Sequence, residues 1–194
     1  MAQSLILAST SPYRRELLQR LGLRFEVQAP DTDETRLPGE TPQALVCRLA
    51  HAKAAAVAAE LPDGGLVIGS DQAAVCAGQI FGKPGDLATA REQLAAASGR
   101  ELHFFTAVCL LDAASGEHQD HLDSTRVCFR ALESAEIDRY LAREQPFNCA
   151  GSFKSEGLGI SLCAAIETRD PTALVGLPLI AVAQMLRAMG VEVP

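Results

Sequence analysis

The sequence is poor in lysine and lacks tryptophan: 3 lysines stand beside 14 arginines, and aromatic residues make up 5% of its 194 residues. Acidic residues outnumber basic ones by 24 to 17, which leaves a formal net charge of −7. Non-specific nucleic-acid binding needs a broad basic surface, and this balance of charges does not supply one. We therefore expect no nucleic-acid partner.

No hydrophobic run approaches the roughly 20 apolar residues of a membrane-spanning helix. The longest uncharged stretch, residues 171–186, is interrupted by Gly176 and Pro178. The apolar run at residues 5–8 is too brief for a signal peptide, and no basic residue precedes it. We expect a cytoplasmic protein with no membrane partner.

The cysteines and histidines show no metal-binding pattern. None of the six cysteines stands at a CxxC spacing, which favours small buried side chains over a disulfide framework or a zinc site. His118 and His121 are three residues apart, but the acids around them are typical of a solvated polar turn. We expect no metal at this histidine pair.

A chain of this length, 48% apolar, is expected to form a single domain over residues 1–194. Strand-like and helix-like patterns alternate along it, which is typical of the α/β class. Two long strand patterns follow each other without a helix, so the sheet should be mixed, with at least one antiparallel pair. Strands are expected over residues 5–8, 24–27, 66–69, 101–111 and 122–129, with a hairpin-like segment up to Pro84. Helices are expected over residues 12–22, 42–60, 86–97 and 134–144, and a last helix is expected to end near Gly190.

The hydroxyl-rich turn Ser9-Thr10-Ser11 links the first strand to a helix that Pro12 opens. Free backbone N–H groups and the dipole make such a helix N-terminus attractive to anions. Ser11 also caps the helix, but capping leaves Arg14 and Arg15 unexplained, because cations in a first turn oppose the dipole at a cost of roughly 0.3–1 kcal/mol. A phosphate would remove this conflict, so we favour a phosphate site.

The three lysines are expected where a compact point charge is useful. Lys53 is expected on an apolar helix face. The common alternative to ligand binding at such a position is that the aliphatic part of the lysine side chain is buried while its amine reaches water. Lys83 stands between Gly82 and Pro84, and Lys154 lies in a glycine-rich loop.

Acidic residues add a third signal. Asp71 follows the apolar run at residues 66–70, so we expect it at the end of a strand, where α/β proteins bind ligands. Asp31, Asp33 and Glu34 lie in the preceding loop, where at least one is expected to be merely solvated. Magnesium is usually held by one or two carboxylates together with substrate phosphates. The acids and cations together indicate metal-dependent hydrolysis of a phosphate ester or a nucleotide.

Seven segments, in this order and spacing, resemble a known family. They are Leu-Ala-Ser-Thr-Ser-Pro-Tyr-Arg-Arg at 7–15, Asp33-Glu34, Arg-Leu-Ala-His-Ala-Lys-Ala at 48–54, Gly-Ser-Asp-Gln at 69–72, Gly82-Lys-Pro, Thr106 and the loop at 149–159. Over essentially the whole chain the sequence is similar to the Maf family of nucleoside triphosphate pyrophosphatases. The resemblance implies a fold like that of inosine triphosphate pyrophosphatases: a mixed, elongated β-sheet flanked by helices, with two lobes around a cleft.

The resemblance also implies an activity and roles for individual residues. The family hydrolyses a nucleoside triphosphate to the monophosphate and pyrophosphate with a divalent cation, Mg²⁺ or Mn²⁺, often as a homodimer. The matching positions are Ser9, Arg14, Lys53 and Lys83 for substrate phosphates, Glu34 and Asp71 for the metal, Asp71 also as the catalytic base, and Tyr13, Gln72 and Glu156 for substrate specificity.

Within the family, the loop at 149–157 is similar to the branch that acts on 7-methyl-GTP. The branch acting on dTTP and UTP has an arginine where Tyr13 stands and a glutamine where Glu156 stands, while other members of the 7-methyl-GTP branch have tryptophan at the Tyr13 position. A carboxylate such as that of Glu156 can accept both N1–H and N2–H of guanine. A cationic N7-methylated base is attracted to the face of Tyr13 by roughly 0.5–2 kcal/mol. The expected function is hydrolysis of 7-methyl-GTP to 7-methyl-GMP and pyrophosphate, which would remove modified nucleotides from the pool.

Other functions stay open at this point. The substrate could be UTP, dTTP or a damaged purine nucleotide. The chain could instead be a regulatory nucleotide-binding protein, since the family it resembles is linked to cell-division arrest. A purely structural scaffold leaves the cationic first turn unexplained.

Overall fold

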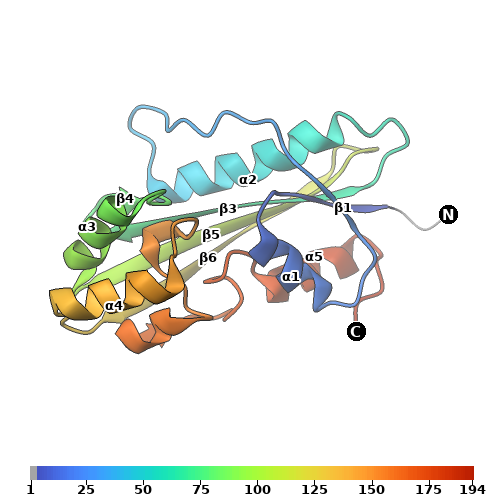
Figure 1. The fold of residues 1–194 in the computed structure, drawn as a ribbon. Helices are drawn as coiled ribbons and strands as arrows, with labels where there is room; N and C mark the ends of the chain where they lie inside the picture. The colour runs from blue at the N-terminus through green and yellow to red at the C-terminus, as the bar shows by residue number, and fades with distance from the viewer. Residues whose placement is uncertain (1–3) are drawn as a thin grey trace. The chain divides into compact units, whose positions relative to one another are not determined.

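The structure is a computed structural model that describes residues 4–194. Over these residues the chain forms seven strands, five α-helices and two short 3-10 helices (Figure 1). The strands are β1 Leu5–Ala8, β2 Glu26–Gln28, β3 Leu66–Cys76, β4 Gln79–Phe81, β5 Glu101–Asp112, β6 His118–Phe129 and β7 Cys163–Glu167. The helices are α1 Pro12–Gln19, α2 Pro42–Ala58, α3 Leu87–Ala97, α4 Ser134–Glu144 and α5 Leu179–Ala188, with the 3-10 turns η1 Ala150–Ser152 and η2 Leu158–Leu162.

The strands form one mixed sheet in the order β2-β1-β3-β5-β6-β7, with β4 beside β3. β1 pairs in parallel with both β2 and β3, whereas β4 pairs antiparallel to β3 and β7 antiparallel to β6. The expected α/β class and mixed sheet are therefore confirmed. Among residues 4–194, no helix has both the length and the hydropathy needed to cross a membrane.

The chain divides into two compact units. Unit 1 holds the residues up to Asp71, residues 106–123 and residues 170–194, and unit 2 holds residues 72–105 and 124–169. β3, β5 and β6 each begin in one unit and end in the other.

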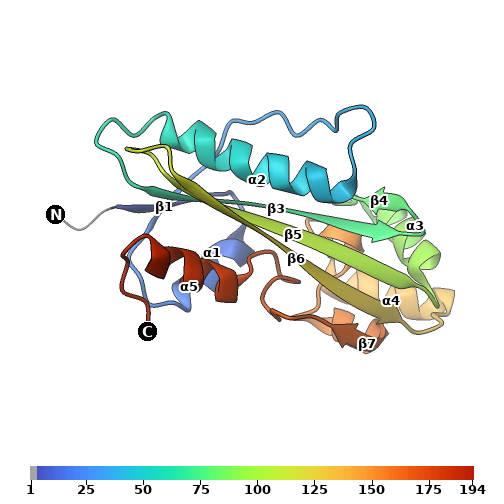
Figure 2. The ribbon, with the colours of Figure 1, turned by 180° about the vertical axis from the view of Figure 1, so that it is seen from behind.

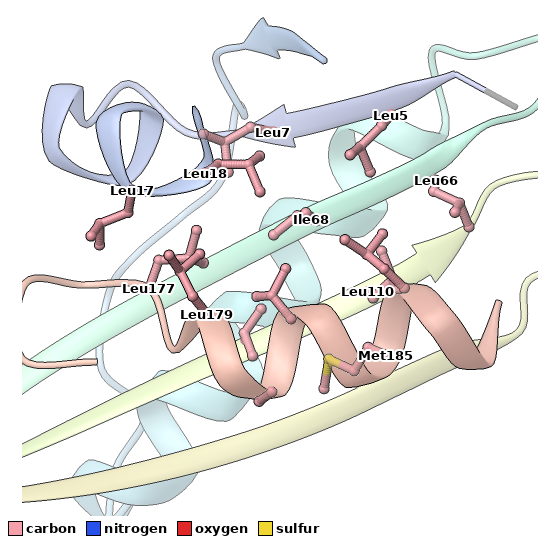
Figure 3. Packing of buried hydrophobic residues seen from close by; sticks show 14 of the residues in the cluster. Leu5, Leu7, Leu17, Leu18, Leu66, Ile68, Leu110, Leu177, Leu179 and Met185 are labelled. Atoms are coloured by element: carbon pink, nitrogen blue, oxygen red, sulfur yellow. The ribbon is translucent and has the colours of Figure 1, made fainter. Parts of the chain in front are cut away.

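The core of unit 1 lies between its strands and the helices α1 and α5 (Figure 3). Leu5, Leu7, Leu66 and Ile68 point to this side because alternate residues of a strand share one face. α2 covers the opposite face of these strands (Figure 2). The same alternation turns Gly69 and then Asp71 toward α2, which is what places an acid beside that helix.

Unit 2 is built around aromatic side chains and the loop before β7. The ring of Phe153 lies 5.9 Å from that of Phe104 and 5.2 Å from that of Phe129, measured between centroids. The Tyr140 hydroxyl of α4 donates to the Ser152 carbonyl at 3.2 Å and accepts the Lys154 N–H at 3.1 Å. These contacts fix the start of the glycine-rich loop to α4.

The helix starts are where the sequence places them. Ser11 Oγ accepts the Arg14 N–H at 3.4 Å, Thr41 Oγ1 accepts the Ala44 N–H at 3.2 Å, and Asp86 Oδ1 accepts the Thr89 N–H at 2.8 Å. Each of these residues caps a helix whose next residue is the first helical one. α4 has the bounds expected for it, residues 134–144.

Three sequence expectations were wrong. β3 continues through Asp71 to Cys76, because residues 72–76 remain extended and residues 74–76 pair with β4, so this acid does not stand at a strand end. His118 and His121 lie in β6 rather than in a polar turn, since pairing along the sheet outweighs the polar composition of the segment. β7 was not expected at all, because its five residues follow a glycine-rich stretch and are recognised only by pairing with β6.

All six cysteines are free thiols. Cys76 and Cys109 are buried, while the other four are half-buried. Burial raises the pKa of the Cys163 thiol to about 11, and the pKa values of Cys76 and Cys109 are raised for the same reason.

Candidate active site

Lys53 stands at the centre of a charged cluster in unit 1. Its Nζ lies 2.7 Å from Asp71 Oδ1 and 2.6 Å from Glu34 Oε1. The residue is only 6% exposed, so the alternative of an amine reaching into water is wrong. A buried charge is tolerated when it is paired, and here two carboxylates meet a single cation.

Three different elements supply this cluster. Lys53 comes from the middle of α2, where it lies among buried alanine, leucine and valine residues. Asp71 comes from the face of β3 that α2 covers, and its side chain is 13% exposed. Glu34 comes from the long segment between β2 and α2, and its side chain is 60% exposed. Lys53 and Asp71 therefore form the buried side of the cluster, and Glu34 forms its solvent-exposed side.

Arg14 of α1 adds a second cation. Its Nε donates to the Gly176 carbonyl at 2.8 Å, and the Ser70 hydroxyl donates to the same carbonyl at 3.0 Å. Burial lowers the pKa of Arg14, while the negative charges of Asp71 and Glu34 act in the opposite direction. Arg14 is thus held by the chain within electrostatic reach of both acids.

The turn before α1 uses its hydroxyl groups locally. Ser9 is 3% exposed, and its Oγ accepts the Ser11 N–H at 3.1 Å. Tyr13 follows in α1 and is half-buried. Both predicted residues belong to unit 1, together with Arg14, Lys53 and the two acids.

The remaining predicted residues belong to unit 2. Gln72 follows Asp71 in β3 and is half-buried. Lys83 is exposed just after β4, and Glu156 is exposed, with its Oε2 accepting the Ser155 hydroxyl at 3.3 Å. Their roles in substrate binding stay predictions of the sequence.

Lys154 has a structural role that the sequence did not reveal. Its Nζ lies 2.7 Å from Glu144 Oε1, and Glu144 Oε2 accepts the Leu158 N–H at 2.6 Å. The hydrogen bond from Lys154 is the main reason that the pKa of Glu144 is lowered. This pair ties the loop that carries Glu156 to the end of α4.

The carboxylates of Glu34 and Asp71 suit a divalent cation that binds together with a phosphate-containing substrate. Within residues 4–194, no three His, Cys, Asp or Glu side chains are grouped to hold a metal by themselves. Glu34 and Asp71, however, meet at one Nζ, and magnesium is usually bound by one or two carboxylates plus substrate phosphates. Of the three loop acids, Glu34 is the one beside Asp71, whereas Asp33 accepts the Thr35 N–H at 2.9 Å.

One ion pair beside the cluster has no counterpart in the sequence predictions. Arg48 Nε lies 2.7 Å from Glu40 Oε1, and the Arg48 guanidinium holds the pKa of Glu40 down at about 2. Glu40 lies before the start of α2 and Arg48 lies within it, so no helical spacing in the sequence marks the two residues as partners. In the sequence, Arg48 stands out only as the first residue of the segment at 48–54.

Comparison with known proteins places this chain in a family. A family model described as "Maf-like protein" matches residues 4–189. The chain belongs to the Maf family. The resemblance found in the sequence is thereby confirmed.

Curated Maf relatives match nearly the full length. The 7-methyl-GTP pyrophosphatase of Alcanivorax borkumensis is 55% identical over 98% of this chain and 96% of its own length. The proteins of the same name from Burkholderia lata and Xanthomonas campestris pv. campestris are 58% and 57% identical, over 95% and 100% of this chain and 89% and 100% of their own lengths. Among solved structures, the Staphylococcus aureus Ham1 protein aligns with a TM-score of 0.43 and 16% identity, over 66% of this chain and 72% of that chain. The family assignment rests on the family model and the sequence relatives.

Proposed function

We propose that this Maf protein is a nucleoside triphosphate pyrophosphatase that hydrolyses 7-methyl-GTP to 7-methyl-GMP and pyrophosphate. The observation that carries the proposal is the buried Lys53 amine between the carboxylates of Glu34 and Asp71, with Arg14 in electrostatic reach. The choice of substrate is supported by relatives named 7-methyl-GTP pyrophosphatase that are 55–58% identical to this chain.

The cations of the proposed site neutralise the triphosphate. Lys53 and Arg14 supply fixed positive charges, and Lys83 is assigned the same role from its match to the family motif. Glu34 and Asp71 are the residues that would hold a divalent cation. When bound, such a cation supplies positive charge that stabilises the phosphoryl oxygens as the bond to the leaving group breaks.

Asp71 acts as the general base. Its carboxylate accepts a proton from a water molecule, whose oxygen attacks the α-phosphorus while the bond to the bridging oxygen breaks and pyrophosphate leaves. The ion pair with Lys53, at 2.7 Å, keeps this carboxylate oriented. The aromatic face of Tyr13 and the carboxylate of Glu156 recognise the cationic, N–H-donating edge of the methylated base, with Gln72 also assigned to specificity.

A nucleotide panel tests the proposal. Purified protein with magnesium should release pyrophosphate faster from 7-methyl-GTP than from GTP, UTP or dTTP. Faster release from UTP or dTTP would assign the chain to the other branch of the family. Tight nucleotide binding without pyrophosphate release would replace the proposal with the regulatory nucleotide-binding alternative.

Glu156→Gln is expected to lower kcat/KM for 7-methyl-GTP by at least about tenfold relative to UTP. A hydrogen bond to a charged group contributes about 1.5–3 kcal/mol, and the amide can accept only one of the two base N–H groups well. The measurement is the ratio of kcat/KM values for the two nucleotides. Glu92→Gln, an exposed carboxylate of α3 in the same unit, is the matched control. An unchanged ratio would remove Glu156 from base recognition.

A divalent cofactor, a cytoplasmic location and a homodimeric assembly belong to the same proposal. The divalent cofactor and the dimer follow from the family resemblance. Nucleotide hydrolysis by the isolated chain does not depend on the cytoplasmic location or on the homodimer.

A further inference from the structure

The segment that carries Glu34 has little structure of its own. Residues 29–40 form neither helix nor strand, and residues 33–39 are all exposed. The segment passes alongside α2 (Figure 1). Within the segment, Arg36 Nε donates to the Glu40 carbonyl at 2.9 Å, and Glu34 reaches to 2.6 Å from Lys53 Nζ on α2. Contacts with α2 fix where the segment lies against that helix.

Arg48 makes those contacts from α2. Its Nε and Nη2 donate to the two carboxylate oxygens of Glu40 at 2.7 and 2.9 Å, and Nη2 also donates to the Thr35 carbonyl at 3.1 Å. Glu40 Oε2 in turn accepts the Leu37 N–H at 3.1 Å. One guanidinium thus ties down the residue that follows Glu34 and the end of the segment.

The arrangement has a simple geometric basis. Arg48 and Lys53 lie on the same rigid helix, α2, and they contact neighbouring residues of the segment: Arg48 the Thr35 carbonyl, Lys53 the Glu34 carboxylate. The Glu40 side chain is 8% exposed, so this ion pair is shielded from solvent on one side. Bidentate pairs between arginine and a carboxylate are the stronger and more specific kind, and lysine cannot form them.

We propose that Arg48 is a positioning residue whose bonds to Glu40 and Thr35 hold the Glu34 carboxylate against Lys53 and Asp71. We refer to these bonds as the Arg48 clamp. The consequence for catalysis rests on the proposed function, because it requires Glu34 to be part of the reacting site. A displacement of about 1 Å in a catalytic group can cost on the order of a hundredfold in rate, so even a partial release of the segment matters.

Limited proteolysis tests the clamp without reference to activity. Trypsin can cut after Arg36, which is exposed inside the segment, and mass spectrometry identifies the resulting fragments. Arg48→Gln and Glu40→Gln should each raise the rate of this cut by about tenfold in folded protein, with Arg48→Lys in between. Arg126→Gln is the matched control, since Arg126 also bridges carboxylates, those of Glu101 and Glu167, with a similar exposure of 38% against 32% for Arg48.

Kinetics then test positioning. In Arg48→Gln we expect kcat for pyrophosphate release to fall by about tenfold while KM changes less than about twofold, because Arg14 and Lys53 still bind the triphosphate. Arg48→Lys should recover part of kcat, and thermal melts establish that each variant is folded.

Two results would overturn the inference. One is an Arg36 cut that is no faster in either Arg48→Gln or Glu40→Gln. The other is a faster cut in an enzyme whose kcat is unchanged. If the unmodified protein hydrolyses no nucleotide, the proposed function fails, and the cleavage rates still decide whether the Arg48 clamp holds the segment.

Discussion

Replacing Asp71 with asparagine is expected to lower the rate of pyrophosphate release by about 10³-fold while nucleotide binding is retained. Asparagine preserves the shape of the side chain but cannot accept a proton from water, and general-base catalysis contributes roughly 10²–10⁴-fold. Lys53 and Arg14 remain in place to bind the triphosphate. Steady-state kinetics on 7-methyl-GTP measure the rate, and calorimetry measures the affinity.

Asp31→Asn is the matched control for that experiment. Asp31 is an exposed acid in the same segment as Glu34, and none of the contacts that join Glu34 and Asp71 to Lys53 involves it. Its substitution should leave turnover within about twofold. If Asp71→Asn retained full activity, Asp71 would not be the base, and the water would have to be activated by another group.

Gly69→Ala is expected to destabilise the protein by about 3 kcal/mol and to abolish most activity. A Cβ at this position would lie 2.1 Å from the Ala50 carbonyl oxygen and 2.7 Å from the Ala54 nitrogen. Both atoms belong to the backbone of α2, so the helix itself would have to move away from β3. Lys53 is on that helix and Asp71 is on that strand, so the same movement would pull their ion pair apart. Urea unfolding measures the loss of stability.

Gly82→Ala is the control for Gly69→Ala. Nothing lies within 4 Å of a Cβ added there, and the backbone at Gly82 is in a region open to any residue. Its free energy of unfolding should change by less than about 0.5 kcal/mol. A Gly69→Ala protein as stable as the Gly82→Ala protein would contradict the close packing of α2 on β3.

Local signals in the sequence predicted most of the elements. Ser11, Thr41 and Asp86 mark helix starts because a cap depends on the next few residues alone. Strand bounds were less accurate, as the continuation of β3 and the early start of β6 show. A strand extends as far as its neighbours pair with it, and that information lies in distant segments.

Local signals in the sequence also predicted part of the candidate site. The scarcity of lysine pointed to Lys53, and the acid after an apolar run pointed to Asp71, because both signals are visible within a few residues. The choice of Glu34 among three loop acids came from the family resemblance, and the structure places its carboxylate at Lys53. The Arg48–Glu40 pair was missed because an exposed-looking arginine and a loop acid carry no local sign that they are partners.

The sequence by itself determined the class of fold, the family and the identity of the charged residues, since these depend on residue type, spacing and periodicity. Only the tertiary structure decided which charges meet. Glu34, Lys53 and Asp71 come from a loop, a helix and a strand, and they are joined because strand alternation and the close contact at Gly69 set α2 against β3. Such contacts depend on the packing of whole elements, which no short stretch of sequence encodes.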